Sequence, residues 1–432
     1  MLKQSTYELS NALTQTDLKV LEAIYLFRCL TIRQVYKNFY TEQIQSFELF
    51  QSTKLKELIE FDVVELQEFN RGNYSLFLTS NGVEVVRYTC DLPTNIMDEK
   101  NKVVKRGYYR AGELKMLPRL VNHQVHLNQF VLDFKKEADN KNLKWKYYGE
   151  KYVSQYANIR PDGLIQSLDI DFFLEMDMNT ESQKQLVEKW QNYRNFLTSR
   201  EYSYKEKRIV VLFIIENATN IEKRKDIVRL TSSQILLDIF DSDFDIYIGT
   251  SEELMTLVFD KLIPNVQQSN WRQEVIKNKL LEKFSFNVAN GDRLKKALNN
   301  SEYGYYIRKI DQNNNIVVEN RRIQEYLFDD YFHRPLSVLK KIAYLQRNTS
   351  YFKSHYGRDI SYIVLIENED MAYHDLKIVD LVGVKNVYFT TLERVEKLPF
   401  HEAIFQYDSL GNIHHFTNSG LTDRIFEKNL ER

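Results

Sequence analysis

The sequence predicts a mixed α/β protein built from several domains, and three observations lead to this fold class. The chain has 432 residues, more than one compact core usually holds. Its 43% hydrophobic and 28% charged residues are the proportions of ordinary globular proteins. Runs with helical periodicity alternate with short runs rich in β-branched and aromatic residues. The expected segments are a winged helix-turn-helix at 1–95, a basic linker at 96–120, an αβββαβαβ domain at 121–255 and a C-terminal α/β domain at 256–432.

The bulk composition restricts where the protein works and what it contacts. No apolar run approaches the roughly 20 residues that cross a bilayer, and the start lacks the apolar stretch of a secretory signal. We therefore expect a cytoplasmic protein with no membrane contact and with Cys29 and Cys90 reduced. The formal net charge is −1, so any contact with a polyanion must be local.

The first segment has the order of elements of a winged helix-turn-helix. Thr16, Thr31 and Thr79 are the expected N-caps. The expected elements are helices at about 16–28, 31–40 and 41–61, strands at 63–69 and 74–80 joined by a turn at 70–73, and a helix at 80–88. In this arrangement the third helix usually enters the major groove of DNA.

The third helix and the hairpin turn supply the expected DNA contacts. The helix residues that should face outward are Gln43, Gln45, Gln51, Ser52, Lys54 and Lys56. These side chains suit base edges, and Arg71 in the hairpin turn adds a positive charge. An alternative stays open, because residues 1–95 carry nine Lys or Arg against twelve Asp or Glu, a net charge of −3. A winged helix that binds protein would have the same pattern.

The linker is strongly basic, with seven Lys or Arg against one acid between Lys100 and Arg119. It is either a solvated connection or a source of phosphate contacts through residues such as Lys105 and Arg106. The second interpretation would compensate for the acidity of the first segment.

Two acidic motifs mark the third segment, in which we expect helices at about 117–138, 180–199 and up to 238. The expected strands span 143–153, 159–165, 169–177, 208–216 and 244–250. Asp162 lies in Arg-Pro-Asp-Gly, and Glu175-Met176-Asp177 ends the next strand. Residues two apart on a strand share a face, and neighbouring strands lie about 5 Å apart, so the three carboxylates can converge. Asp162 and Glu175 would then hold Mg²⁺ or Mn²⁺. The alternative is a turn residue and two exposed strand-end charges.

The order of three stretches, LVNHQVHLNQF, RPDG and FFLEMDMNTESQKQLVEKWQNY, resembles the replication-relaxation family of plasmids and conjugative elements. The likeness covers about residues 13–250. The matching positions are His123, Asn128, Asp162, Glu175, Asp177, Lys189 and Tyr193. The resemblance implies a protein that acts on double-stranded DNA in replication, relaxation or transfer.

The family's core in turn resembles the PD-(D/E)XK nuclease fold, in which an acid-x-Lys motif binds metal and stabilises the attacked phosphate. In this sequence Asp177 stands at the lysine position. Lys184 or Lys189 on the following helix would take its place, and Lys189 matches the family. The resemblance implies that Asp162, Glu175, Asp177 and Lys189 form the catalytic set.

The sequence pattern of the C-terminal segment is similar to that of the third segment. KKIAYLQRNTSYFKS, ISYIVLIEN and VKNVYFTT parallel KWQNYRNFLTSREYS, RIVVLFIIEN and FDIYIGT in order and spacing. This is either a degenerate second copy or the generic likeness of helix-strand units. A copy lacking Pro-Asp and Glu-x-Asp would serve binding or dimerisation. Three functions stay open: a Mg²⁺-dependent DNA nuclease or nickase, a non-catalytic DNA-binding regulator or accessory factor that uses the fold as a platform, and a protein-interaction scaffold.

Overall fold

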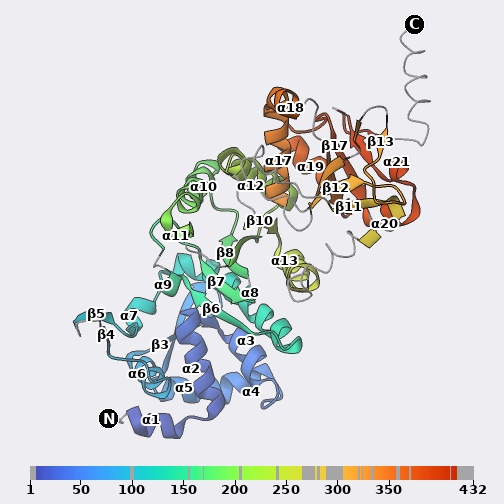
Figure 1. Cartoon of the computed structure of the whole chain (residues 1–432). Coiled ribbons are helices and arrows are strands. Elements are labelled where there is room, and N and C mark those ends of the chain that lie inside the picture. Colours follow the sequence, from blue (N-terminus) through green and yellow to red (C-terminus); the bar gives the residue numbers. More distant parts are fainter. Residues whose placement is uncertain are drawn as a thin grey trace. The chain divides into compact units, whose positions relative to one another are not determined.

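The computed structural model has the expected mixed α/β fold, with helices and several sheets along the chain (Figure 1). The described residues are 6–97, 102–153, 156–168, 170–203, 207–239, 243–264, 278–279, 283–288, 305–319, 322–323, 325–331, 335–356, 361–368, 371–408 and 410–415. Lys100, in the predicted basic linker, lies outside them. Among the described helices none is long and apolar enough to cross a membrane.

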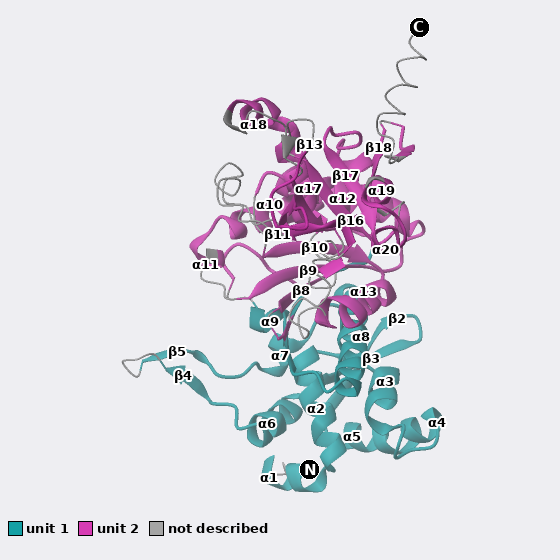
Figure 2. Ribbon diagram, turned by 45° about the vertical axis from the view of Figure 1, so that its right-hand side comes forward, with its two compact units in different colours: residues 1–154, 162–164, 176–178 teal, residues 155–161, 165–175, 179–432 magenta. Residues whose placement is uncertain are grey.

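The chain divides into two compact units (Figure 2). Unit 1 comprises residues 1–154, 162–164 and 176–178, and unit 2 comprises 155–161, 165–175 and 179–432. The boundary passes through two neighbouring strands of the third segment. Each unit is described by itself below.

Unit 1 begins with the helices and the hairpin predicted for the first segment. Its helices are α1 (Thr6–Ala12), α2 (Gln15–Phe27), α3 (Ile32–Val35) with the π-helical turn η1 (Tyr36–Tyr40), α4 (Phe47–Phe50) with the π-helical turn η2 (Gln51–Leu55), α5 (Lys56–Glu60) and α6 (Ser80–Thr89). Its first sheet has the antiparallel order β1-β3-β2, from β1 (Leu30–Thr31), β2 (Val64–Asn70) and β3 (Asn73–Leu78). Gly72 takes a positive φ of 77° in the hairpin turn, where a side chain would be strained.

Two helix starts differ from the expectation. Helix α2 is capped by Thr14 and not by Thr16. The Thr14 side chain accepts the Asp17 N–H while the Asp17 carboxylate accepts the Thr14 N–H, a reciprocal box that Thr16 cannot form because Lys19 stands three residues later. The third helix begins at residue 47, because the side chain of Ser46 accepts the N–H of Leu49.

The remaining caps agree with the sequence, and the third helix is continuous. Thr31 and Thr79 cap α3 and α6 as predicted. Elements α4, η2 and α5 follow without a break, and we call them together the 47–60 helix. Gln43 and Gln45 therefore precede this helix and do not belong to its outer face.

The rest of unit 1 contains a β-ribbon where the sequence indicated only a linker. Strands β4 (Asn95–Met97) and β5 (Val103–Arg106) pair in antiparallel. They are followed by α7 (Ala111–Leu114), α8 (Pro118–Asn140), β6 (Trp145–Gly149) and α9 (Glu150–Val153). The predicted strand at 143–153 thus ends at Gly149, and its last part is helical.

The third segment contains the predicted strands and helices in order. They are β7 (Gly163–Ser167), β8 (Ile170–Asp177), α10 (Gln183–Leu197), α11 (Arg200–Ser203), β9 (Arg208–Ile215), α12 (Ile221–Leu236), β10 (Phe244–Gly249), α13 (Ser251–Leu257) and the π-helical turn η3 (Val258–Leu262). The strand order is β10-β9-β8-β7-β6, with β9 and β10 parallel and almost fully buried. Such apolar strands are typical of a sheet covered on both faces.

The C-terminal part of unit 2 contains a seven-stranded sheet, a separate two-stranded sheet and several helices. Its strands are β11 (Phe286–Val288), β12 (Tyr305–Lys309), β13 (Val318–Glu319), β14 (Arg322–Ile323), β15 (Glu325–Asp330), β16 (Tyr362–Ile366), β17 (Val387–Thr391), β18 (Phe405–Tyr407) and β19 (Ile413–His415). Its helices are α17 (Pro335–Arg347), α18 (Thr349–Tyr356), α19 (Met371–Ile378), α20 (Leu392–Lys397) and α21 (Phe400–Ala403).

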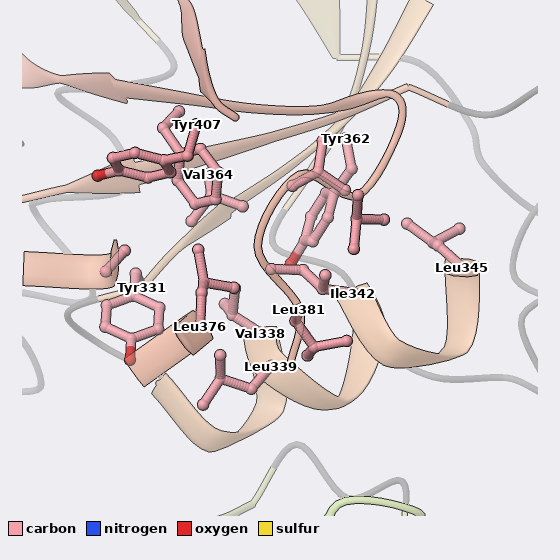
Figure 3. Packing of buried hydrophobic residues seen from close by; sticks show 14 of the residues in the cluster. Tyr331, Val338, Leu339, Ile342, Leu345, Tyr362, Val364, Leu376, Leu381 and Tyr407 are labelled. Carbon is pink, nitrogen blue, oxygen red and sulfur yellow. The ribbon is translucent and has the colours of Figure 1, made fainter. Parts of the chain in front are cut away.

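The larger sheet of this part has the order β11-β12-β15-β16-β17-β18-β19, and β15, β16 and β17 are parallel. Helix α17 places Val338, Leu339 and Ile342 against Tyr362 and Val364 of β16 in one buried cluster (Figure 3). This cluster forms the main core of the C-terminal part.

Candidate functional site

The outer face of the 47–60 helix is mostly polar, as predicted, although Leu49 and Ile59 are also exposed, and one of the predicted residues does not belong to this face. Gln51, Ser52 and Lys56 are exposed. Lys54 instead turns inward: its Nζ lies 3.1 Å from Asp17 Oδ2 and 2.7 Å from Glu57 Oε2, and its side chain is 15% exposed. The expectation that Lys54 faces outward is wrong, because a buried carboxylate on α2 attracts the ammonium group.

That carboxylate, Asp17, is fully buried, and both of its oxygens accept hydrogen bonds. It accepts hydrogen bonds from the Tyr40 hydroxyl at 2.5 Å and from the Thr14 N–H at 2.8 Å. Burial alone would raise the pKa of Asp17, but the hydrogen bonds from Tyr40, Thr14 and Lys54 outweigh it and lower this pKa. Lys54 therefore holds the 47–60 helix against α2.

The other predicted DNA contacts of unit 1 lie on two hairpins. Arg71 is exposed in the turn between β2 and β3, where Glu68 Oε1 accepts the Gly72 N–H at 2.8 Å. Lys105 is exposed on β5. The neighbouring Arg106 is half-buried and pairs with Glu113 at 2.8 Å. Lys105 thus offers its charge to solvent, whereas the charge of Arg106 is partly neutralised.

Asp162 forms a compact network within unit 1. Its Oδ2 accepts the Met176 N–H at 2.8 Å and lies 3.3 Å from His123 Nε2. The same His123 nitrogen is 2.9 Å from the Met176 carbonyl oxygen. Helix α8 and the end of β8 are thereby joined through one carboxylate. Asp177, next on the strand, is fully buried.

The asparagine that matched the family has a structural position. Asn128 is fully buried on α8, and its Nδ2 donates to the carbonyl oxygens of Phe27 at 3.2 Å and Cys29 at 2.6 Å. Gln124 in turn donates to Asn128 Oδ1 at 2.9 Å. These bonds satisfy carbonyls at the end of α2, so Asn128 ties α8 to the helices before it.

Glu175 lies in unit 2 at the centre of a second network. Its Oε2 is 2.8 Å from Lys189 Nζ, and its Oε1 accepts the Tyr193 hydroxyl at 2.6 Å. Lys189 Nζ also lies 3.0 Å from Glu181 Oε1 and 5.3 Å from the centre of the Phe213 ring. The family resemblance singled out Lys189, on the helix after Glu175, as the substitute for the missing strand lysine, and its catalytic role stays a prediction. The resemblance gave no signal for Glu181.

This network opens on a pocket of about 510 Å³ within unit 2. Its lining combines charged, amide and aromatic side chains: Asn158, Arg160, Glu175, Glu181, Gln185, Glu188, Lys189, Asn192 and Tyr193. Glu175 is 3% exposed, while the Lys189 side chain is 19% exposed. At the Glu175 network the pocket thus offers the Lys189 ammonium group, and not the Glu175 carboxylate, to an entering ligand.

Glu175 as folded is not an open ligand for a hard cation. Both of its oxygens are engaged, and a cation would have to displace the Lys189 ammonium. Among the described residues no group of three or more His, Cys, Asp or Glu side chains is arranged to hold a metal ion. The convergence of Asp162, Glu175 and Asp177 stays a prediction.

Comparison with known proteins adds a family to this geometry. Residues 21–212 match the family described as Replication-relaxation. Over this segment the chain is similar to the replication-relaxation family. No curated protein and no solved structure matches the chain. The family suggests a protein concerned with the replication or relaxation of mobile elements.

Proposed function

We propose that this protein, which is similar to the replication-relaxation family over residues 21–212, binds double-stranded DNA through its first segment and acts as a non-catalytic factor in replication, relaxation or transfer of a mobile element. The observation that carries the proposal is the polar outer face of the 47–60 helix, followed by the β2–β3 hairpin. A recognition helix presents such a face to base edges in the major groove, and a wing contacts the neighbouring backbone.

The side chains that remain exposed define the contact. Gln51 suits adenine edges, Ser52 suits either kind of base, and Lys56 suits a phosphate or a guanine. Lys56 also lies 3.6 Å from Glu60, but both side chains are more than half exposed, so this surface pair is weak and breaks readily. Arg71 in the hairpin turn would reach the backbone.

A charge reversal on this face tests the proposal. Lys56→Glu is expected to weaken binding to duplex DNA about tenfold and to lower the slope of log affinity against log salt by about 1. Fluorescence anisotropy over a range of salt concentrations measures both quantities. Lys136→Glu, an exposed lysine on α8, is the charge-matched control and should bind like the wild type. If the two variants bind equally, the contact does not lie on the 47–60 helix.

The uncharged side chains on the same face, Gln51 and Ser52, allow recognition of the DNA sequence to be tested separately from charge. Gln51→Ala combined with Ser52→Ala should narrow the affinity difference between a duplex selected from a random pool and an unselected duplex. The salt slope should stay unchanged, because neither residue is charged. An unaltered preference would show that these two residues do not read bases.

A Mg²⁺-dependent nuclease is the second candidate, and the position of Lys189 favours it. An ammonium beside a strand-end carboxylate, at the border of a pocket of about 510 Å³, would stabilise the charge on a scissile phosphate. The engagement of both Glu175 oxygens counts against an open metal site. We therefore favour the non-catalytic DNA-binding factor over the nuclease.

Metal dependence separates the two candidates. If the nuclease candidate is right, Mn²⁺ raises the melting temperature and supports nicking of supercoiled plasmid, and Glu175→Gln abolishes both. Asp162→Asn is the better variant at the second acid, since its amide oxygen can still accept the Met176 N–H. If Mn²⁺ has neither effect on a protein that binds DNA, the nuclease candidate is wrong.

A further inference from the structure

The β4–β5 ribbon is the most exposed element of unit 1. Figure 2 shows it extending away from the helices of that unit. Asn95 pairs with Arg106 and Ile96 with Lys105, and the register then shifts so that Met97 pairs with Val103. Every described residue of the two strands is exposed except Arg106, which is half-buried.

The exposed side chains of the ribbon are mainly apolar. Ile96, Met97, Val103 and Val104 are 39%, 51%, 57% and 63% exposed. A ribbon of two strands has no second layer in which to bury them, and an isolated hairpin is only marginally stable in water. Contiguous exposed apolar side chains usually mark a binding surface.

The root of the ribbon is held firmly on the first segment. Gly107 donates its N–H to the Thr94 carbonyl at 3.1 Å, and a Cβ at Gly107 would lie 2.1 Å from the Pro93 carbonyl oxygen. The Arg87 guanidinium lies 5.3 Å from the Tyr108 ring centre, and the Tyr25 hydroxyl accepts the Tyr109 N–H at 2.8 Å. The ribbon therefore has a fixed origin on α2 and α6.

The charge of the ribbon indicates the kind of partner. Residues 95–106 contain four Lys or Arg and two acids, and both acids lie at 98–99, between the strands. Lys102 and Lys105 are exposed beside the valines. The same strands thus present positive charge and apolar side chains, a combination that suits the phosphates and thymine methyl groups of DNA.

We propose that the β4–β5 ribbon is a DNA-binding arm that lies in the major groove of the duplex bound by the first segment. The inference rests on the proposed DNA binding and adds a second contact to it. A two-stranded ribbon fits the major groove, which is about 12 Å wide, but not the minor groove of about 6 Å. Val103 contacts thymine methyls, while Val104 points to the opposite face of the strand, and Lys102 and Lys105 reach the phosphates that border the groove.

Two double variants of the full chain separate these roles in an anisotropy assay. Val103→Ser with Val104→Ser is expected to lower affinity for duplex DNA about tenfold with an unchanged salt slope. Lys102→Gln with Lys105→Gln is expected to lower the slope by about 2. Replacing thymine by uracil in the DNA removes the methyl groups, and it should weaken the wild type but not the valine variant. Val318→Ser, on the exposed β13–β14 ribbon of unit 2, is the matched control and should change nothing.

The outcomes that overturn the arm differ from those that overturn DNA binding itself. If the valine variant binds DNA like the wild type while Lys56→Glu does not, the proposal that the ribbon binds DNA is wrong. The proposed function of the first segment then stands. If the valine variant instead changes the sedimentation of the free protein, with DNA affinity unaltered, the ribbon is a protein interface and the proposal is wrong. If the wild type binds no duplex, both proposals are wrong.

Discussion

At the scale of single residues, two lysines two positions apart have different roles. Lys54 is 15% exposed and pairs with the buried Asp17, whereas Lys56 is 70% exposed. Lys54→Met should lower the free energy of unfolding by about 1–3 kcal/mol, because Asp17 loses a charge-assisted hydrogen bond. Lys56→Met should change it by about 0.5 kcal/mol or less. Urea unfolding of both variants measures the contrast, and equal effects would contradict the buried pair.

The lowered pKa of Asp17 also predicts how stability depends on acid. The unfolded carboxyl titrates near pH 3.9, and the folded one titrates below this value. The stability that Asp17 contributes is therefore complete above about pH 4 and is lost as the pH falls through the folded pKa. Asp17→Asn should flatten this part of the profile in urea unfolding between pH 5 and pH 2.5. A variant profile parallel to that of the wild type would contradict the assignment.

At the scale of elements, helix α6 contains Gly82, a position at which helix propensity alone would favour alanine. Alanine is favoured over glycine in a helix by about 1 kcal/mol. A Cβ at Gly82 would nevertheless lie 2.0 Å from the Val63 backbone oxygen, which is fixed at the start of the hairpin. Overpacking of this kind costs about 1–3 kcal/mol or more, so Gly82→Ala should lower the melting temperature.

Gly112 on α7 provides the control for this prediction. No atom lies within 4 Å of a Cβ built there, and the residue is exposed. Gly112→Ala should leave stability unchanged or raise it by about 0.5–1 kcal/mol. If both alanine variants melt like the wild type, the close approach of α6 to the hairpin is wrong.

At the scale of the whole molecule, unit 2 contains two networks of an acid, a lysine and a tyrosine. In the C-terminal part, Lys341 Nζ on α17 and the Tyr362 hydroxyl each lie 2.9 Å from Asp329 Oδ2 on β15. The central strand order β17-β16-β15-β12-β11 parallels β10-β9-β8-β7-β6. These likenesses favour a second copy. Asp329 and Asp330 place acids at the end of β15, although the C-terminal segment lacks the Pro-Asp and Glu-x-Asp motifs.

The two networks differ in access to water, and this predicts different effects of the same substitution. The Lys341 and Asp329 side chains are 2% and 3% exposed, whereas Lys189 borders the pocket. Lys341→Met should cost about 3–5 kcal/mol, since it leaves a sealed carboxylate without its cation. Lys189→Met should cost clearly less, because water can enter beside Glu175. Chemical denaturation of both variants tests the difference, and the reverse order would contradict it.

The sequence by itself determined the order of most elements and two of the three caps that it predicted. Thr31, Thr79 and the strands at 163–167 and 170–177 follow from periodicity and capping, which act within a few residues. The likeness to a known family also singled out Lys189 on the helix that follows Glu175. These predictions needed no knowledge of distant contacts.

The tertiary structure decided which of the predicted side chains remain available to contact DNA or a ligand. Lys54 turns inward because Asp17, 37 residues earlier, is buried beneath it. Lys189 is shared between Glu175 and Glu181, and β4 pairs with β5 where the composition indicated only a linker. Local pattern fixes helices and strands because their hydrogen bonds are local. The partner of a charge depends instead on which distant groups share its desolvated surroundings, and only the packed fold determines that.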